Sequence, residues 1–273
     1  MTTIFDNSKC SRCGICGNIC PAGVITTNKE SGYPEILPAN AENCIFCGHC
    51  EAVCPQSAVT VTAQQLKEAA TFGKKADISA EQIGSYIRFR RSIRAYEQKA
   101  VPKKTLEELL DIAHYAPTAI NAQPVRWIIV HDTAKLKGLV KTAISWMRAA
   151  IENKLPIADT LDFAWLVKDY ENGHDPICRN AAHLVLTHAP KDNLMAVGDS
   201  AIALATFELA APAFGLGTCW AGYFRIIANG SAEVNKELGI PDGHVCTGAM
   251  MVGYPKYQYK RIPKRNKIQA IWL

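Results

Sequence analysis

The sequence predicts a protein that combines helices with strands, of the α/β or α+β class, in two domains of unequal size. Eight of its eleven cysteines fall within the first 54 positions, which sets a small N-terminal region apart from the rest. Beyond it, stretches with helical spacing of apolar residues alternate with short apolar runs typical of strands. A length of 273 residues, 48% hydrophobic and 20% charged, suits one or two globular domains and excludes a disordered or collagen-like chain.

The cysteines of the N-terminal region form a duplicated motif. Its members are Cys10, Cys13, Cys16 and Cys20, followed by Cys44, Cys47, Cys50 and Cys54. Each run reads C-x2-C-x2-C-x3-C-P, and the second lies 34 residues after the first. This arrangement resembles bacterial ferredoxins with two [4Fe–4S] clusters, in which the fourth cysteine of a run binds the cluster of the other run. We therefore expect one cluster on Cys10, Cys13, Cys16 and Cys54, and the other on Cys20, Cys44, Cys47 and Cys50.

Two other uses of these cysteines are less consistent with the sequence. Residues 1–6 lack a basic lead-in to an apolar stretch, so no export signal is expected and a disulfide framework is disfavoured. Zinc sites usually take two C-x2-C pairs, which would leave two cysteines of each run unexplained. We expect a cytoplasmic protein and, because such clusters need protection from oxygen, an anaerobic or strongly reducing host.

The predicted domain boundaries follow from local patterns. The cluster domain should span residues 1–62, and a polar linker should occupy residues 63–79. The linker ends at a capping box, in which Ser79 is followed three positions later by Gln82. This box should start the first helix of a second domain, residues 80–273.

Shorter patterns predict the individual elements. The expected strands are residues 24–27 and 33–36, as a hairpin between the cysteine runs, and then 127–130, 183–187 and 245–252. The expected helices are residues 105–115, 134–152 and 195–214. In the first of these helices Leu106, Leu109 and Leu110 recur at helical spacing. The last is strongly apolar, but Glu208 and Pro212 favour a buried helix over a membrane span.

Charge is distributed unevenly between the two domains. Residues 1–62 carry three basic and five acidic residues, a net of −2. Since the whole chain has 30 basic and 25 acidic residues, the remainder carries 27 against 20, a net of +7. This asymmetry predicts an anionic ligand for the larger domain. The total of +5 is too mild to predict a nucleic-acid partner.

Two basic segments are candidate anion sites. Residues 88–94 contain four arginines, whose forked guanidinium groups suit phosphate oxygens, together with the hydroxyl donor of Ser92. Residues 256–267 contain six basic residues, with Tyr257 and Tyr259 among them. By themselves these segments fit three interpretations: a phosphate-cofactor site, a solvated basic face, or a nucleic-acid surface on which tyrosines stack on bases.

The glycine-rich stretch at residues 215–222 narrows the choice of ligand. It is not a G-x-G-x-x-G fingerprint, because Trp220 stands at the third glycine position, and the chain has no Walker A sequence. We expect a loop, with no strand before it, whose backbone N–H groups lie against a planar ring and bind its polar edge. The alternative is a helix C-cap and turn in which Gly215 or Gly217 takes a positive φ, and the two interpretations are compatible.

Five segments together resemble the FMN-dependent nitroreductase family. They are residues 90–96, 116–124, 215–222, 253–255 and 260–263, which read RRSIRAY, APTAINAQP, GLGTCWAG, GYP and KRIP. Their order and spacing match the family over roughly residues 80–273. With the cluster domain in front, the whole chain is similar to ferredoxin–nitroreductase fusions found in anaerobes.

This resemblance implies an α+β fold, with a mixed sheet flanked by helices, in an intertwined homodimer that binds FMN at the subunit interface. It implies FMN contacts from Arg90, Arg91, Ser92, Arg94, Thr118, Asn121, Gln123, Cys219, Trp220, Ala221, Gly222, Lys260 and Arg261. Arg90, Ser92 and Arg94 would hold the phosphate and ribityl chain, and Arg261, helped by Lys260, would close on the phosphate. The threonine and asparagine of the second segment would approach from the partner subunit, and the backbone of the glycine-rich stretch would face the ring.

These cofactors together predict an oxidoreductase. Iron–sulfur clusters carry one electron at a time, whereas FMN accepts two singly and then delivers hydride, so no side chain is expected to act as a catalytic residue. Electrons from reduced ferredoxin or a similar low-potential donor would pass through the clusters to FMN and reduce a nitroaromatic, quinone or activated alkene. The alternative is an electron-transfer adaptor with no small-molecule substrate. Neither hypothesis involves nucleic acid or a membrane.

Overall fold

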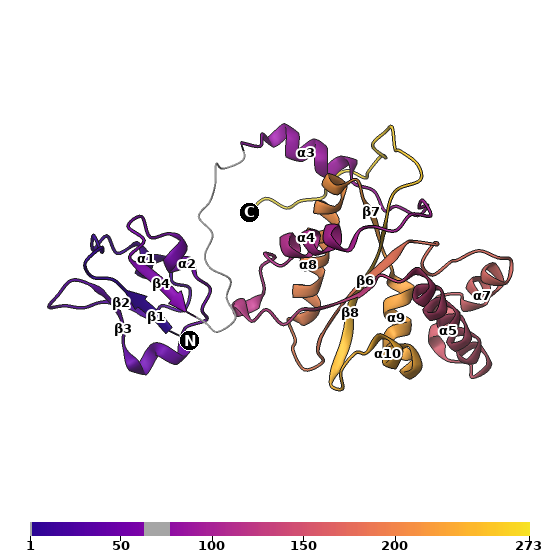
Figure 1. Ribbon diagram of the computed structural model, residues 1–273, viewed down its shortest axis with the longest axis horizontal. Coiled ribbons are helices and arrows are strands. Elements are labelled where there is room, and N and C mark those ends of the chain that lie inside the picture. Colours follow the sequence, from indigo (N-terminus) through magenta and orange to yellow (C-terminus); the bar gives the residue numbers. More distant parts are fainter. Residues whose placement is uncertain (1, 63–76) are drawn as a thin grey trace. The chain divides into compact units, whose positions relative to one another are not determined.

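The structure is a computed structural model that describes residues 2–62 and 77–273 (Figure 1). Residues 63–76 of the predicted linker lie outside the described residues. The chain divides into two compact units: Met1–Asp77 with Ala119–Ala122, and Ile78–Thr118 with Gln123–Leu273. The boundaries of the two domains at residues 62 and 80 stay predictions.

Two small antiparallel sheets build the first unit. β1 (Thr2–Phe5) pairs with β4 (Val59–Thr62), and β2 (Ile25–Thr27) pairs with β3 (Pro34–Ile36). The second pair is the predicted hairpin between the cysteine runs. Along β4 the valines are buried and the threonines are exposed, as the period of two in a half-buried strand requires. The helical segments of this unit are α1 (Ile15–Ile19), η1 (Pro38–Asn43) and α2 (His49–Ala52).

A four-stranded sheet with the order β5-β6-β8-β7 forms the centre of the second unit. Its strands are β5 (Arg126–Val130), β6 (His183–Pro190), β7 (Gly217–Trp220) and β8 (His244–Gly253). Neighbouring strands of this sheet pair antiparallel, whereas Ser92 joins Thr218 of β7 through a parallel bridge. The sheet is therefore mixed through this bridge, and the α+β class is confirmed.

Helices cover both faces of this sheet (Figure 1). The α-helices of this unit are α3 (Ala80–Phe89), α4 (Lys103–Ala113), α5 (Thr133–Glu152), α6 (Pro156–Thr160), α7 (Phe163–Glu171), α8 (Ala196–Ala210), α9 (Gly222–Gly230) and α10 (Ala232–Leu238), and α3 has no buried residue. α4 and α8 pack with Val185 and Met250, whereas α5, α7, α9 and α10 pack with Leu184 and Met251. Because successive strand residues point to opposite faces, β6 and β8 are buried on both sides.

Most predicted elements of the second unit are confirmed. α3 begins at the predicted capping box: the Ser79 hydroxyl accepts the Gln82 N–H at 3.1 Å, and the Gln82 side chain accepts the Ser79 N–H at 2.8 Å. The strands predicted at 127–130, 183–187 and 245–252 are β5, β6 and β8. The long apolar helix is α8, which continues as the 3-10 turn η3 (Ala211–Phe214).

One prediction is wrong: the glycine-rich stretch is not a loop, because four of its residues form the edge strand β7. Three glycines in eight residues give this stretch little intrinsic strand preference. Its pairing with β8, in which Cys219 lies opposite Met251, makes it a strand. The alternative interpretation, a helix C-cap with a positive φ, is confirmed at Gly215, which ends η3 and has a φ of 70°.

Ala196–Phe214, which comprises α8 and η3, is the one helix in the described part of the chain that is long and apolar enough to cross a membrane. Leu204 and Phe207 on this helix are fully buried against the sheet. On its other side Val197 and Ile202 are 54% and 45% exposed. One side of α8 therefore packs on the sheet, and its other side exposes apolar side chains.

A buried histidine joins three segments at the start of β6. The His183 ring stacks on His131 with centroids 4.3 Å apart. Its Nε2 accepts the Val101 N–H at 2.8 Å, which leaves Nδ1 to donate its proton to the carbonyl oxygen of His131 at 2.7 Å. Both ring nitrogens are therefore satisfied only in the neutral form, and burial lowers the pKa of His183 below its ordinary 6.5.

We expect the second unit to lose thermal stability as the pH falls below about 6.5. Since the pKa of His183 is lower in the folded than in the unfolded protein, stability is complete above 6.5 and decreases toward the folded-state pKa. His188, whose pKa is lowered by burial and then by His244, contributes in the same direction. The variant His183→Gln should show a shallower pH slope of its melting temperature, whereas His114→Gln, at an exposed position, should not. A wild-type midpoint that stays constant from pH 7.5 to 5.5 would contradict this expectation.

Candidate functional site

Two cavities in the first unit each collect four cysteines of the duplicated motif. One is lined by Cys10, Cys13, Cys16 and Cys54, and we call it site 1. The other is lined by Cys20, Cys44, Cys47 and Cys50, and we call it site 2. Each cavity takes three cysteines from one run and the fourth from the other run. The fold thus brings together the two sets of four that the motif predicts.

The thiols of both sites suit metal ligation, and all eleven cysteines are free of disulfides. The Ile15 N–H and the Ser11 hydroxyl lower the pKa of the Cys13 thiol, which favours the thiolate form that binds metal. Burial raises the pKa of Cys50 to about 11. A cation at site 2 is then needed to keep this thiol deprotonated at neutral pH. The donor set therefore fits iron–sulfur clusters at both sites.

Removal of iron should unfold the first unit and leave the second unit folded. In the described residues of the first unit the buried hydrophobic side chains are Cys16, Val24, Ile25, Ala58, Val59 and Val61, and cores this small are rarely stable without metal or disulfides. Hydrogen exchange of the chelator-treated protein should show loss of protection in residues 2–62 and retained protection in α5. Retained protection in β1 and β4 without iron would contradict this expectation.

In the second unit, segments far apart in the sequence converge on β7. The Ile93 N–H donates to the carbonyl oxygen of Thr218 at 2.8 Å, and Tyr96 forms an antiparallel bridge with Pro255. Gly217 permits this approach, because a Cβ there would overlap the Ile93 side chain and lie 2.9 Å from Pro255. The arginine segment, the glycine-rich stretch and the GYP segment therefore meet at one place.

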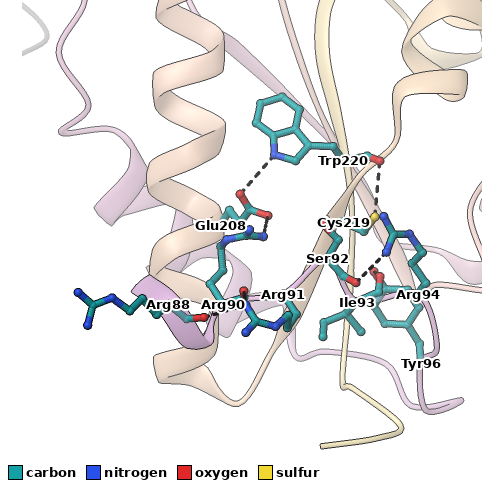
Figure 2. Close-up of polar contacts among 10 residues, drawn as sticks. All are labelled: Arg88, Arg90, Arg91, Ser92, Ile93, Arg94, Tyr96, Glu208, Cys219 and Trp220. Atoms are coloured by element: carbon teal, nitrogen blue, oxygen red, sulfur yellow. Dashed lines mark hydrogen bonds and ion pairs between the residues drawn. The ribbon is translucent and has the colours of Figure 1, made fainter. Parts of the chain in front are cut away.

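Glu208 of α8 links the arginine segment to the end of β7 (Figure 2). Its Oε1 accepts a hydrogen bond from Arg90 Nη1 at 2.9 Å, and its Oε2 accepts one from Trp220 Nε1 at 3.3 Å. The side chains of Glu208 and Arg90 are 10% and 25% exposed, so this ion pair is largely shielded from water. Glu208 is not among the site residues that the sequence motifs predict. The signal was an acidic residue among apolar neighbours, which needs a cation once it is buried.

Arg91 has unused hydrogen-bond donors. Its Nη1 donates to the carbonyl oxygens of Arg88 and Arg90. Its Nε and Nη2 are buried and have no hydrogen-bond partner in the described part of the chain. Buried donors of a cation are costly to leave unpaired, and they form their strongest bonds with anionic oxygens. This guanidinium therefore fits a bound phosphate group.

Arg94 and Cys219 lie on the other side of Ser92 (Figure 2). Arg94 Nη1 donates to the carbonyl oxygen of Ser92 at 3.5 Å. Burial raises the pKa of the Cys219 thiol, although Arg94 and Arg179 act against the shift. A buried thiol with a raised pKa is a poor nucleophile, which fits the expectation that this cysteine does not act as a catalytic residue.

Arg179 is a second residue that the motifs did not predict. It is half-buried and takes a left-handed φ of 57°, followed by Asn180 with a φ of 52°. The Asp175 carboxylate holds this turn, because it accepts the backbone N–H groups of Ile177, Cys178 and Asn180 at 2.8–3.0 Å. No periodicity or spacing in the sequence marks this arginine, and only the turn brings its charge near Cys219.

Three other predicted FMN contacts lie between α4 and β5. Thr118 Oγ1 accepts the Gln123 N–H at 3.0 Å. The Asn121 side chain, which belongs to the first unit, donates to the carbonyl oxygens of Ile45 and Phe46 at 3.1 and 3.2 Å. The approach of Thr118 and Asn121 to a partner subunit's flavin stays a prediction, as does the FMN contact of Gln123.

The basic C-terminal residues and the end of β7 differ in burial. Lys260 and Arg261 lie in the exposed segment after β8 and form no hydrogen bond or ion pair with the described residues. Ala221 is 2% exposed and donates its N–H to Ala249 at 2.8 Å, directly before Gly222 starts α9. The backbone at Trp220–Gly222 is therefore held firmly, whereas the basic segment is not.

Comparison with known proteins identifies both parts of the chain. Residues 9–59 match the family described as a 4Fe-4S dicluster domain, and residues 87–254 match the nitroreductase family. A protein from Archaeoglobus fulgidus, named putative NADH dehydrogenase/NAD(P)H nitroreductase, is 30% identical over 176 residues, which are 64% of this chain and 87% of that protein. An NAD(P)H-dependent FMN reductase of Bacillus subtilis is 27% identical over 64% of this chain and 66% of its own length.

Among solved structures, a crystal structure of a nitroreductase with bound FMN from Bacteroides fragilis shares the fold of the second unit. Its TM-score is 0.56 at 24% identity, over 70% of this chain and 98% of that protein. The matched family spans more than half of the 273 residues and contains the arginine segment, Glu208 and β7. The chain therefore belongs to the nitroreductase family, with a dicluster ferredoxin domain at its N-terminal side.

Proposed function

We propose that the protein is an FMN-dependent oxidoreductase that receives low-potential electrons through two [4Fe–4S] clusters and reduces an electron-poor organic acceptor, such as a nitroaromatic, quinone or activated alkene. The observation that carries this proposal is the pair of cysteine quartets at site 1 and site 2, in one chain with a nitroreductase domain. An enzyme fed by NAD(P)H alone would not need these clusters. Reduced ferredoxin or a similar low-potential carrier is the proposed donor.

The second unit supplies the proposed FMN site. Arg91 donates its buried Nε and Nη2 protons to the phosphate, and Ser92 and Arg94 continue along the ribityl chain. Arg90 adds a second cation that Glu208 holds in place. When bound there, FMN supplies the hydride chemistry of the reaction. The backbone at residues 219–222 lies against the ring, and Lys260 with Arg261 closes over the phosphate from the C-terminal segment.

A second copy of the chain completes this site in the proposal. Thr118, Asn121 and Gln123 approach the flavin from the partner subunit. Exposed apolar side chains on α8 and just before it support a homodimer: Leu194, Met195, Val197 and Ile202 are 45–90% exposed. Exposed apolar side chains that gather in one patch usually mark protein interfaces. We also propose a cytoplasmic location, since α8 is accounted for by packing on the sheet and against a second subunit.

The first test is an anaerobic count of iron, sulfide and FMN in the purified protein, followed by visible spectra during reduction. We expect about eight iron atoms and one FMN per chain, with bleaching of both chromophores by dithionite or reduced ferredoxin. Rapid reoxidation by small acceptors would support the reductase, whereas reoxidation by a protein partner alone would favour the adaptor. Iron without FMN would overturn the proposal, and fast flavin reduction by NADH or NADPH would make the clusters an exit route.

A further inference from the structure

The two cysteine loops have nearly the same backbone. Arg12 and Phe46 occupy equivalent positions of the 34-residue duplication, and both take left-handed φ values, 59° and 49°. Two positions later, Gly14 and Gly48 both have a φ of 72° and precede the short helices α1 and α2. The loops therefore offer two cluster sites whose main chains match, so differences between the sites must come from side chains and burial.

The side chains of the two loops differ in polarity. Site 1 has Ser11 and Arg12 between its first two cysteines, and both are exposed. Site 2 has Ile45 and Phe46 at the same positions, and both are half-buried. The Arg12 guanidinium lies 4.2 Å from the centre of the Tyr33 ring. This contact holds the guanidinium on the β2–β3 hairpin, next to Pro34, which lines site 1.

Hydrogen-bond donors to the sulfur atoms also differ between the two sites, and site 1 is again the more polar. At site 1 the Arg12 N–H donates to Cys10 Sγ at 3.4 Å, and the Ala58 N–H donates to Cys54 Sγ at 3.2 Å. At site 2 the Glu51 N–H donates to the Cys50 thiol, and Thr3 Oγ1 lies 4.0 Å from Cys44 Sγ. Site 1, where Cys13 also accepts the Ile15 N–H, thus combines a cation, more N–H donors to sulfur and exposed loop residues. Site 2 combines apolar side chains with fewer donors to sulfur.

We infer that the cluster at site 1 has the higher reduction potential of the two, and that Arg12 is the residue that sets the difference. The inference rests on the proposed function, because it requires a cluster at each site. Reduction adds negative charge to a cluster already surrounded by four thiolates. A nearby cation, N–H donors to sulfur and water all stabilise that added charge, and each therefore raises the potential. An electron that enters the protein then occupies site 1 first.

Other charges near the two loops do not reverse the inferred order of the reduction potentials. Lys9, next to Cys10, is paired with Asp6 at 3.1 Å and contributes little net charge. Glu42, two positions before Cys44, adds negative charge on the side of site 2. His49 lies in the second loop, where its side chain is exposed.

The test is a redox titration of the full-length chain at pH 8, with the reduced clusters followed by electron paramagnetic resonance. The wild-type protein should titrate in two steps. Arg12→Phe, which copies the residue of site 2 onto a backbone that accepts it, should lower the upper midpoint and leave the lower one in place. Phe46→Arg should raise the lower midpoint. Arg12→Lys should keep the wild-type separation, since it retains the charge.

The iron and sulfide content of each variant separates failure of this inference from failure of the proposed function. Fewer than about eight iron atoms in the wild-type chain would overturn the proposed function itself. Two full clusters with a single unresolved step, or an upper midpoint unaffected by Arg12→Phe, would overturn the inference alone. If Arg12→Phe loses iron, Arg12→Gln removes the charge but keeps the backbone N–H, and the same lowering of the upper midpoint is expected.

Discussion

Replacing Cys13 with Ala should reduce turnover with reduced ferredoxin by on the order of 100-fold, equivalent to about 2.7 kcal/mol in the barrier. Cys13 lines site 1, so its loss removes one of the four thiolates that hold that cluster. The proposed electron path passes through the clusters, and a missing cluster interrupts it. Because the proposed FMN site lies in the other unit, the FMN content of the variant should stay at one per chain.

The matched control for this variant is Cys246→Ala. Cys246 is also a free cysteine, but it is buried in the core of the second unit and lines neither cluster site. This control should keep its iron and its turnover with reduced ferredoxin. Dithionite should reduce the flavin in both variants, since a small reductant does not require the clusters. Full turnover of the Cys13 variant with reduced ferredoxin would show that the proposed electron path is wrong.

Replacing Glu208 with Ala should destabilise the second unit by about 3 kcal/mol. The change removes the carboxylate from a largely buried ion pair and leaves Arg90 and the Trp220 N–H without their acceptor. Breaking a buried pair by removing one partner typically costs 3–5 kcal/mol, and the partial exposure of Arg90 places this pair at the lower end. Arg90 also loses the contact that orients its guanidinium, so FMN affinity should fall by about tenfold, or about 1.4 kcal/mol.

An exposed ion pair in the same unit provides the control for Glu208→Ala. Glu171 pairs with Arg148 at 2.9 Å, and their side chains are 55% and 45% exposed. Glu171→Ala should change the free energy of unfolding by less than about 1 kcal/mol and leave FMN affinity unchanged. Glu208→Gln keeps one acceptor oxygen, so its free energy of unfolding and its FMN affinity should lie between those of Glu171→Ala and Glu208→Ala. Equal stability of the Ala variants at 171 and 208, measured by denaturant unfolding, would contradict the proposed importance of burial at Glu208.

Much of the fold can be predicted from the sequence because its signals are local. The capping box at Ser79, the apolar spacing around Leu106 and the apolar run of β5 each depend on a few neighbouring residues. The strand β7 could not be predicted in this way. Its glycines disfavour a strand, and only the close approach of Ile93 and Pro255 explains why glycine stands at position 217.

The candidate sites, too, can be predicted from the sequence only where their signals are local. The sequence by itself determined the two cysteine quartets, since cluster ligands recur at fixed short spacings, and it determined the arginine segment and the family. Only the tertiary structure decided that Glu208 pairs with Arg90, 118 positions away, and that Arg91 keeps two buried donors free for an anion. It also placed Arg179 by Cys219 through a strained turn. The physical reason is that burial and charge pairing depend on which distant segments pack together, and no local spacing encodes that choice.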